Sequence, residues 1–367
     1  MKLRTLLIIA AVLAVLDLGL AWHGRAHRAA AAAAGLIDRP LLDPPVLDQA
    51  RRIVIREKPQ TKVLFSNDDG FEVRRIVDKN APIRETDLER EPDNRWVVSN
   101  CFGLDADPTW LGQTMRDLSE GRLIRTVTDD PKLMDSLGLG AAQVRFEDGS
   151  GRVIRQLDFG RNDGGDSYQF VRIDNGTAYL ARHEAALVGD PMNWIDSHVL
   201  VFEPADVREL ELPFQNSAEP PAVLRRASRG APLLPEKGTL PSAASAAAEK
   251  ILSHLLASQI LFVVAHDSPS VQLARQHIAA HLRIVLFDGR EYKIDYGTLP
   301  KGTTGLTDLE DNLPETLAFG FFECSDPQDI TARYNTKAIL VYSRSAIVGL
   351  LPETPASLTS AENNPSP

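Results

Sequence analysis

The segment that decides the fold is residues 141–191, AAQVRFEDGSGRVIRQLDFGRNDGGDSYQFVRIDNGTAYLARHEAALVGDP. Apolar and polar residues alternate in short runs, and glycine-containing turns separate the runs. Alternation with a period of two is typical of strands that have one buried and one solvated face. Asn175-Gly176 lies between two such runs and predicts a tight hairpin whose central residues both take positive φ. We therefore expect a meander of antiparallel strands here.

A diverged copy of this pattern lies at 281–352. Four sets of residues keep their order in the two halves of the chain. Asp148-Gly149 corresponds to Asp288-Gly289, Asp158-Phe159-Gly160 to Asp295-Tyr296-Gly297, Ile53 and Ile55 to Leu210 and Leu212, and Ala178, Leu180, Ala186, Val188 and Gly189 to Ala338, Leu340, Ala346, Val348 and Gly349. The sequence thus predicts an internal duplication. The expected fold class is α+β: two related modules of antiparallel hairpins, each packed with one or two helices, after an N-terminal transmembrane helix.

The pattern divides the chain into six segments. They are a membrane anchor at 1–24, an Ala- and Pro-rich stalk at 25–49, a first α+β module at 50–212, a linker at 213–241, a second diverged module at 242–352 and a disordered tail at 353–367.

Several local expectations follow from turn and helix signals. Asp107-Pro108 predicts the start of a helix that buries Leu111, Met115 and Leu118. Four further helical segments are expected at 132–137, 184–188, 242–258 and 268–281. The charged residues 78–95, which include two prolines, are expected to form a loop insertion.

The amino-terminal segment has the pattern of a membrane helix. Lys2 and Arg4 precede an apolar run from Thr5 to Trp22 in which Asp17 is the single charge. A span needs about 20 residues, with a lower limit of about 17, so the run is either a short membrane anchor or the hydrophobic region of a signal peptide. Basic residues just after the run favour the uncleaved anchor. We expect a single-pass protein of the cell inner membrane with its carboxy-terminal bulk periplasmic.

The composition of the chain further limits the functions that it can have. The 367 residues carry 50 acidic and 40 basic side chains, a net charge of −10, which disfavours general nucleic-acid binding. The two cysteines, Cys101 and Cys324, do not indicate a disulfide framework. Two unrelated thiols are the favoured interpretation, and one bridge in an oxidising compartment is the alternative.

Candidate metal ligands all have a structural explanation. His277 and His281 are four residues apart on an expected helix, but no third ligand is evident, so surface histidines are favoured. Asp68-Asp69-Gly70 and the cluster Asn162–Asp166 lack the spacing of a calcium loop and are expected to form turns. We predict no metal-binding residues.

Candidate catalytic and ligand-binding residues have structural explanations too. His266-Asp267-Ser268 contains triad residue types, but adjacent residues cannot form a triad, and a helix N-cap is expected instead. Trp96, Trp110 and Trp194 could line a binding face, although Trp194 is expected to fill the core. We predict no catalytic residues and no cofactor-binding residues, and hence a protein that is not an enzyme.

The first module resembles a bacterial family known only as domain of unknown function 4340. The resemblance lies in RRIVIR, DADPTWLGQTMRDLSEGRLIRTVTDDPKLMDSLGLG, VRFEDGSGRVIRQLDFG, SYQFVRIDNGTAYLA and DPMNWIDSHVLVFEPADVRELEL, across roughly residues 1–212. The family is similar to auxiliary components encoded beside ABC transporters of the gliding-motility type. The resemblance implies an accessory role in the cell envelope, with transporter subunits or other envelope proteins as partners, and supplies no catalytic residues.

Three functions are compatible with these observations. The leading hypothesis is a non-enzymatic, membrane-anchored extracytoplasmic accessory protein that acts through protein contacts. The alternative is an extracytoplasmic module that binds a glycan or peptide. The third hypothesis is a hydrolase, which requires an Asp–His pair within hydrogen-bond reach in a pocket.

Overall fold

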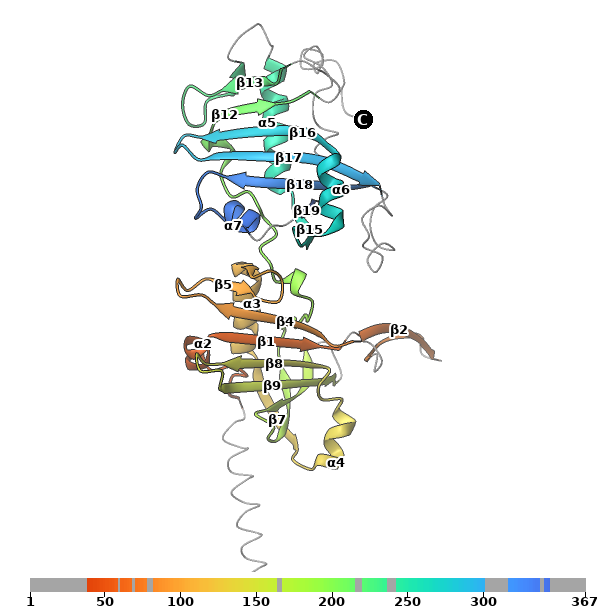
Figure 1. Ribbon diagram of the computed structural model, residues 1–367. Helices are drawn as coiled ribbons and strands as arrows, with labels where there is room; N and C mark the ends of the chain where they lie inside the picture. Colours follow the sequence, from red (N-terminus) through yellow and green to blue (C-terminus); the bar gives the residue numbers. More distant parts are fainter. Residues whose placement is uncertain are drawn as a thin grey trace, which may run out of the picture. The chain divides into compact units, whose positions relative to one another are not determined.

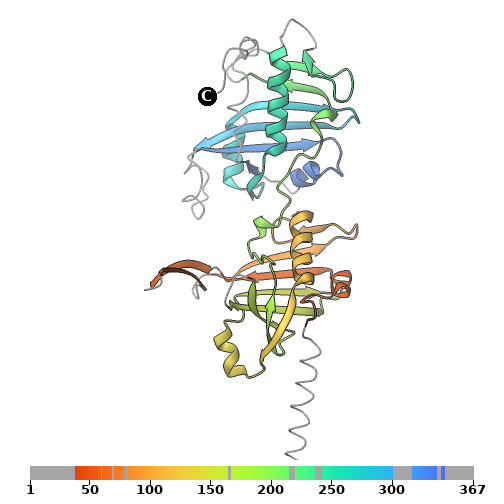
Figure 2. The same ribbon diagram turned by 180° about the vertical axis from the view of Figure 1, so that it is seen from behind.

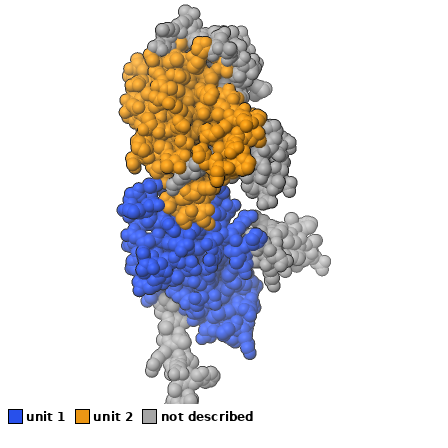
Figure 3. Space-filling view, in the orientation of Figure 1, with its two compact units in different colours: residues 1–96, 108–194 blue, residues 97–107, 195–367 orange. Residues whose placement is uncertain are grey.

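The computed structural model describes residues 38–58, 60–67, 70–77, 82–163, 167–214, 220–235, 242–300, 316–336 and 340–343. The chain divides into two compact units, which Figure 3 colours separately. The first unit comprises Met1–Trp96 and Pro108–Trp194, and the second comprises Val97–Asp107 and Ile195–Pro367.

The first sheet has nine strands in the order β6-β5-β4-β1-β8-β9-β10-β11-β7 (Figure 1). Every pairing that carries a register is antiparallel. The strands are β1 (Arg52–Glu57), β4 (Arg84–Arg90), β5 (Trp96–Val98), β6 (Leu104–Asp105), β7 (Arg122–Thr128), β8 (Ala142–Glu147), β9 (Val153–Asn162), β10 (Tyr168–Ile173) and β11 (Ala178–Arg182). A separate hairpin, β2 (Gln60–Asn67) and β3 (Gly70–Val77), lies between β1 and β4 in the chain.

The second sheet has eight strands in the order β14-β13-β12-β16-β17-β18-β19-β15, again antiparallel. The strands are β12 (Val207–Leu212), β13 (Ala222–Arg225), β14 (Leu234–Pro235), β15 (Ile260–Val264), β16 (Ile278–Leu286), β17 (Glu291–Pro300), β18 (Thr316–Cys324) and β19 (Leu340–Ser343).

The two sheets share one connectivity. If β1 is matched to β12, β4 to β13, β5 to β14, β7 to β15 and β8–β11 to β16–β19, both strand orders become the same apart from the extra edge strand β6. A long helix follows the third matched strand of each sheet, α3 (Pro108–Glu120) for the first sheet and α5 (Ser242–Ala257) for the second. This agreement supports the predicted duplication, and it places the predicted pairs at 148–160 and 288–297 on equivalent hairpins. Four predicted pairs lie partly outside the described residues. Their members in the second copy are Ala338, Ala346, Val348 and Gly349, the partners of Ala178, Ala186, Val188 and Gly189.

Each long helix covers one face of its sheet, as Figure 2 shows from behind. In α3, Leu111, Met115 and Leu118 are buried as predicted, and they cover strand residues such as Ile53 and Phe146, which are fully buried. In the second unit, α5 buries Ala248, Ile251, Leu252 and Leu255 over a face that includes Leu210, Ile284, Tyr292, Ile294 and Tyr296. Burial of apolar area on these two faces supplies the main driving force for folding.

A short helical segment packs on the opposite face of each sheet, which we call the outer face. In the first unit it is α4 (Pro131–Met134) followed by η1 (Asp135–Leu137), and in the second it is α6 (Pro269–Gln276). A Cβ added to Gly160 on β9 would collide with the Leu137 carbonyl oxygen, and one added to Gly297 on β17 would collide with the His277 carbonyl oxygen. The glycine at this matched position therefore lets the end of the short helix approach the sheet backbone.

The remaining parts of the outer faces carry ion pairs that link neighbouring strands. In the first sheet, Arg52 contacts Asp87 at 2.5 Å and Glu147 at 3.2 Å. In the second sheet, Arg283 contacts Glu209 at 2.7 Å, and it also contacts Glu211 and Glu291. These contacts raise the pKa of both arginines, so the guanidinium groups stay charged and satisfied by their neighbours.

The expected loop at 78–95 is wrong, because β4 occupies Arg84–Arg90 within it. The high charge of this segment concealed a strand alternation. Leu88 and Thr86 are fully buried on the helix face. The acidic residues that alternate with them face the arginines of β1, with Glu85 2.5 Å from Arg56.

The expected boundaries between the segments also need correction. Strand β12 lies inside the predicted first module, yet it pairs with β13 and β16 of the second sheet. The predicted linker at 213–241 contains β13 and β14. The predicted stalk at 25–49 is wrong from residue 41 onward, because Leu41 and Leu42 are fully buried and α2 (Pro44–Gln49) follows them.

Three local predictions differ from the structure. The hairpin between β10 and β11 is confirmed, but the central residues with positive φ are Asp174 and Asn175, one position earlier than predicted. Helix α6 ends at Gln276 instead of residue 281, because β16 begins at Ile278. Residues 184–188 form no helical turn.

The predicted membrane anchor at 1–24 and the predicted tail at 353–367 lie outside the described residues. Among the helices that the structure describes, none is both long and apolar enough to cross a membrane.

We predict opposite effects for alanine at three glycines. Gly160→Ala and Gly297→Ala should each lower the free energy of unfolding by about 1–3 kcal/mol, because the new methyl group must displace backbone. Gly112→Ala in α3 should raise it by about 1 kcal/mol, because that position is open and helical. Urea unfolding of the three variants checks this, and equal stabilities would contradict the matched role of Gly160 and Gly297.

Candidate functional site

A polar concavity lies in the first unit, at the carboxyl end of α3. It is a pocket of about 220 Å³ lined by Asp117, Glu120, Gly121, Arg182, His183 and Glu184. His183 and Gly121 are buried, Asp117 is half-buried, and the other three side chains are exposed. His183 therefore lies at the inner end of a pocket with a charged mouth, and we call this the His183 pocket.

The sheet connectivity places these residues together. Helix α3 starts after β5 and β6, at one edge of the first sheet, and ends at β7, which is the opposite edge. The helix must therefore cross the sheet, and its last turn meets β11, the strand next to β7. His183 follows β11 directly, and a Cβ on Gly121 would be 3.0 Å from the His183 Cβ. Glycine at this position allows the imidazole to pack against the helix end.

The hydrogen bonds of His183 fix its tautomer. The Gln169 side-chain Nε2 donates to the Gly160 carbonyl oxygen at 2.7 Å, so the Gln169 Oε1 is an acceptor. This Oε1 lies 2.9 Å from the His183 Nε2, which must therefore carry the proton. The His183 Nδ1 then presents a lone pair. It is buried and has no hydrogen-bond partner among the described residues.

Burial keeps His183 neutral. The side chain is 8% exposed and its ring packs edge-on against Phe159, with 5.1 Å between ring centroids. Burial lowers the pKa of His183 to about 4, although the negative charge of Asp117 acts in the opposite direction. The imidazole is thus uncharged near neutral pH, and its Nδ1 is an acceptor.

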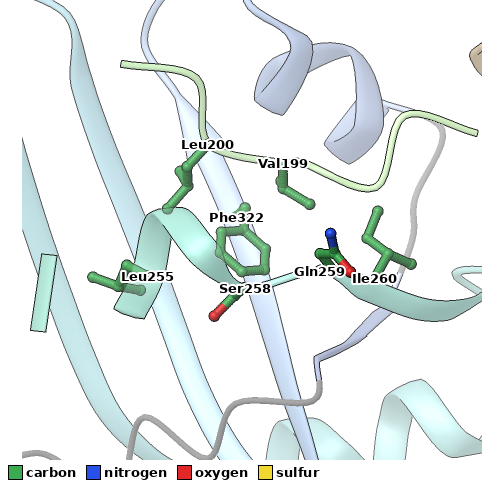
Figure 4. A pocket seen from close by; sticks show the side chains of 7 residues that line it. All are labelled: Val199, Leu200, Leu255, Ser258, Gln259, Ile260 and Phe322. Carbon is green, nitrogen blue, oxygen red and sulfur yellow. The ribbon is translucent and has the colours of Figure 1, made fainter. Parts of the chain in front are cut away.

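The second unit has a counterpart that is almost closed. At the carboxyl end of α5, a cavity of about 10 Å³ is lined by Val199, Leu200, Leu255, Ser258, Gln259, Ile260 and Phe322 (Figure 4). In both units the chain that leads into the sheet covers this position: Leu41 donates to the Gly121 carbonyl, and Ile260 donates to the Ser197 carbonyl. The duplicated fold therefore has a corner of this kind in both units, and among the described residues the lining of the second one is mostly apolar.

The histidines considered from sequence lie elsewhere. His277 is at the C-cap of α6, with Nδ1 2.9 Å from the Leu273 carbonyl oxygen, and His281 is on β16, 2.7 Å from Asp295. Helix α6 ends before both histidines, so they are not aligned on one helix. Ser268 is the N-cap of α6, as predicted for the 266–268 segment. Within the described residues, no group of three or more His, Cys, Asp or Glu could hold a metal ion.

The structure also shows the positions of Trp194 and of the two cysteines. Trp194 is fully buried, donates from Nε1 to the Val188 carbonyl oxygen and packs edge-on against Trp110, so its predicted core role is confirmed. No disulfide joins Cys101 and Cys324, as favoured. The turn residues Asp68, Asp69 and 164–166 lie outside the described ranges.

Sequence analysis missed the His183 pocket. Arg182, His183 and Glu184 are in the segment that was singled out for its strands, but no motif marks them. Their partners Asp117 and Glu120 come from a helix much earlier in the chain, and only the crossing of α3 brings the two groups together. A search for polar residues at the ends of α3 and β11 could have found them.

Comparison with known proteins gives one match. Residues 96–275 match the model of a family described as Domain of unknown function (DUF4340). The match supports the resemblance, although it begins and ends later than the expected range of 1–212, and it includes the whole His183 pocket. Neither the curated proteins nor the solved structures contain a match to the chain.

We predict a pH dependence that originates in His183. Its pKa is about 4 in the folded chain and 6.5 in the unfolded chain, so between these values the unfolded chain binds more protons. Stability therefore falls as the pH falls from 6.5 to 4, by about 2 to 3 kcal/mol from this group. The free energy of unfolding at pH 7 and pH 4.5 should differ less in His183→Phe than in the wild type. His277→Phe, at an exposed histidine, is the control and should keep the wild-type difference.

Proposed function

We propose that this chain is a non-enzymatic, membrane-anchored extracytoplasmic accessory protein that acts by binding, in association with an ABC transporter or other envelope machinery. The apolar run at 5–22 and the basic residues on both sides of it support the anchor. The family match supports the resemblance from which the envelope role was inferred.

The state of His183 is the observation that favours binding over catalysis. A general base works best when its pKa is close to the working pH, because it must both accept and release a proton. Burial holds the pKa of His183 far below that range, while Gln169 holds its tautomer. His183 is therefore poorly suited to act as a general base near neutral pH.

The Asp–His pairs bear on the hydrolase hypothesis. His281 lies 2.7 Å from Asp295, and His198 lies 3.3 Å from Asp196. Both imidazoles are exposed, and neither pair lines the two pockets described above. These pairs therefore lack the dry surroundings in which a base is activated.

A second candidate function is a ligand-binding module, as the alternative from the sequence stated. The His183 pocket is the observation in its favour, because it combines a concave shape with convergent polar groups. The ligand would then be a small polar group instead of an extended glycan, because the pocket is below the volume of about 300–1,000 Å³ that drug-sized ligands occupy.

The accessory role predicts a specific location and specific partners. We expect the full chain in the inner-membrane fraction, with protease removing its carboxy-terminal bulk only after the outer barrier is opened. Affinity purification from native membranes, quantified against a chain that lacks residues 1–24, should recover transporter or envelope subunits in stoichiometric amounts. Recovery of the chain in the soluble fraction, or of no such subunit, would contradict the proposal.

A further inference from the structure

We propose that strand β3 (Gly70–Val77) binds a second copy of this chain, so that two β2–β3 hairpins join edge to edge in one antiparallel four-stranded sheet. The two β3 strands are related by a two-fold axis that passes through Val73. This inference goes beyond the accessory role proposed above and does not depend on it.

The β2–β3 hairpin is separate from the core of the first unit. It forms a two-stranded sheet of its own, and neither strand pairs with another strand in the part of the chain that the structure describes. Figure 1 shows it as a separate element beyond the end of β1. The matched connection of the second sheet, residues 213–221 between β12 and β13, is far shorter than residues 58–83 between β1 and β4. The duplicated fold therefore does not need this hairpin.

A hairpin of this kind lacks a source of stability. Two strands alone are at most marginally stable in water, and a third strand or a covering helix is needed to order them. The sequences of β2 and β3, QTKVLFSN and GFEVRRIV, are nevertheless rich in β-branched and aromatic residues and contain no proline. A further strand at one edge would supply the missing stabilisation. The sequence thus suits a hairpin that completes its sheet on a partner.

The backbone of β3 presents an edge for such a strand. Asn67 and Gly70 are paired across a two-residue loop, and a closing pair of this kind exchanges both of its hydrogen bonds. Hydrogen-bonded pairs alternate along an antiparallel ladder, so the N–H and C=O groups of Phe71, Val73 and Arg75 point away from β2. An added antiparallel strand would pair with these groups.

The charges of β3 favour a second copy as the added strand. Hydrogen bonding requires that outward-facing residues meet one another, so a two-fold axis passes through a residue, which then faces its own equivalent. Registers centred on Glu72, Arg74 or Arg75 place like charges directly opposite, which is destabilising. The register centred on Val73 instead places Glu72 opposite Arg74 of the second copy, and the symmetry repeats this pair. The sequence of β3 is therefore complementary to itself in this register.

The same register aligns apolar residues across all four strands. Leu64 is opposite Val73 within the hairpin. The axis through Val73 therefore gives a row of Leu64, Val73, Val73 and Leu64 on one face of the sheet. Strand β2 offers no comparable selection, because Lys62 is its single charged residue. Charge and hydrophobic pattern thus agree on self-pairing through β3.

The first test is cross-linking of the full chain, in detergent and in native membranes. In a Cys324→Ser background, Val73→Cys should form a disulfide-linked dimer under mild oxidation. Directly opposed Cα atoms on antiparallel strands are about 4.5–5.5 Å apart, which is within the range of a disulfide. Val63→Cys, on β2, is the matched control and should stay monomeric, because its equivalent lies three strands away. Absence of the Val73→Cys dimer, or its replacement by a cross-link to another membrane protein, would overturn the inference.

Charge reversal tests the register. In sedimentation equilibrium, Glu72→Arg and Arg74→Glu should each raise the dissociation constant of the dimer about tenfold or more, because each turns two opposite-charge pairs into like-charge pairs. The double variant should return to about the wild-type value, and an equimolar mixture of the two single variants should form a heterodimer. Arg116→Glu, at an exposed position of α3, is the control and should leave dimerisation unchanged.

Folding is measured separately from pairing. Urea unfolding of each single variant should match the wild type, because the hairpin is outside the core, and heterodimer formation requires that both variants are folded. A wild-type chain that is monomeric at every concentration measured, or single variants that dimerise as tightly as the wild type, would contradict self-pairing. The accessory role is judged by location and by co-purified subunits, so either proposal can fail without the other.

Discussion

The structure depends on one long-range constraint, the insertion of the first strand of each unit into the middle of its sheet. Strand β1 pairs with β4, which follows it, and also with β8, which comes after α3, β7 and α4. In β1 all three residues Ile53–Ile55 are buried, so the strand must be covered on both sides. The chain between β4 and β8 therefore has to cross the helix face, return along the far edge and cover part of the outer face.

This constraint also creates the corner where the His183 pocket lies. Any chain with this connectivity brings the end of its long helix next to the closing strands of its meander. The corner exists in both units, but a duplicated fold has no need to use both copies. In the second unit Phe322 and Leu255 help to fill it, which adds buried apolar area. In the first unit, polar side chains take the place of that filling, and the buried acceptor of His183 costs stability.

The sequence was informative wherever the period of the hydrophobic pattern was undisturbed. The long helices, the hairpins around Asp148-Gly149 and Asp288-Gly289, and the repeat itself could all be predicted. Prediction failed for β4, where Glu85, Asp87 and Glu89 concealed the buried positions Thr86 and Leu88. It also failed at Leu41 and Leu42, which are surrounded by prolines but lie in the core. The His183 pocket could not be predicted, because its residues meet only through the crossing of α3.

The outer faces explain why these sheets can carry so many charged residues without forming sites there. Asp158 is 1% exposed, yet Arg172 contacts it at 2.8 Å and Gln143 donates to it at 2.6 Å. A buried carboxylate with this many donors is satisfied, and removal of one partner would leave an uncompensated charge. Charged groups on the outer face thus bind to one another. The His183 Nδ1 differs from Asp158 because the described residues fix it as an acceptor and supply no donor.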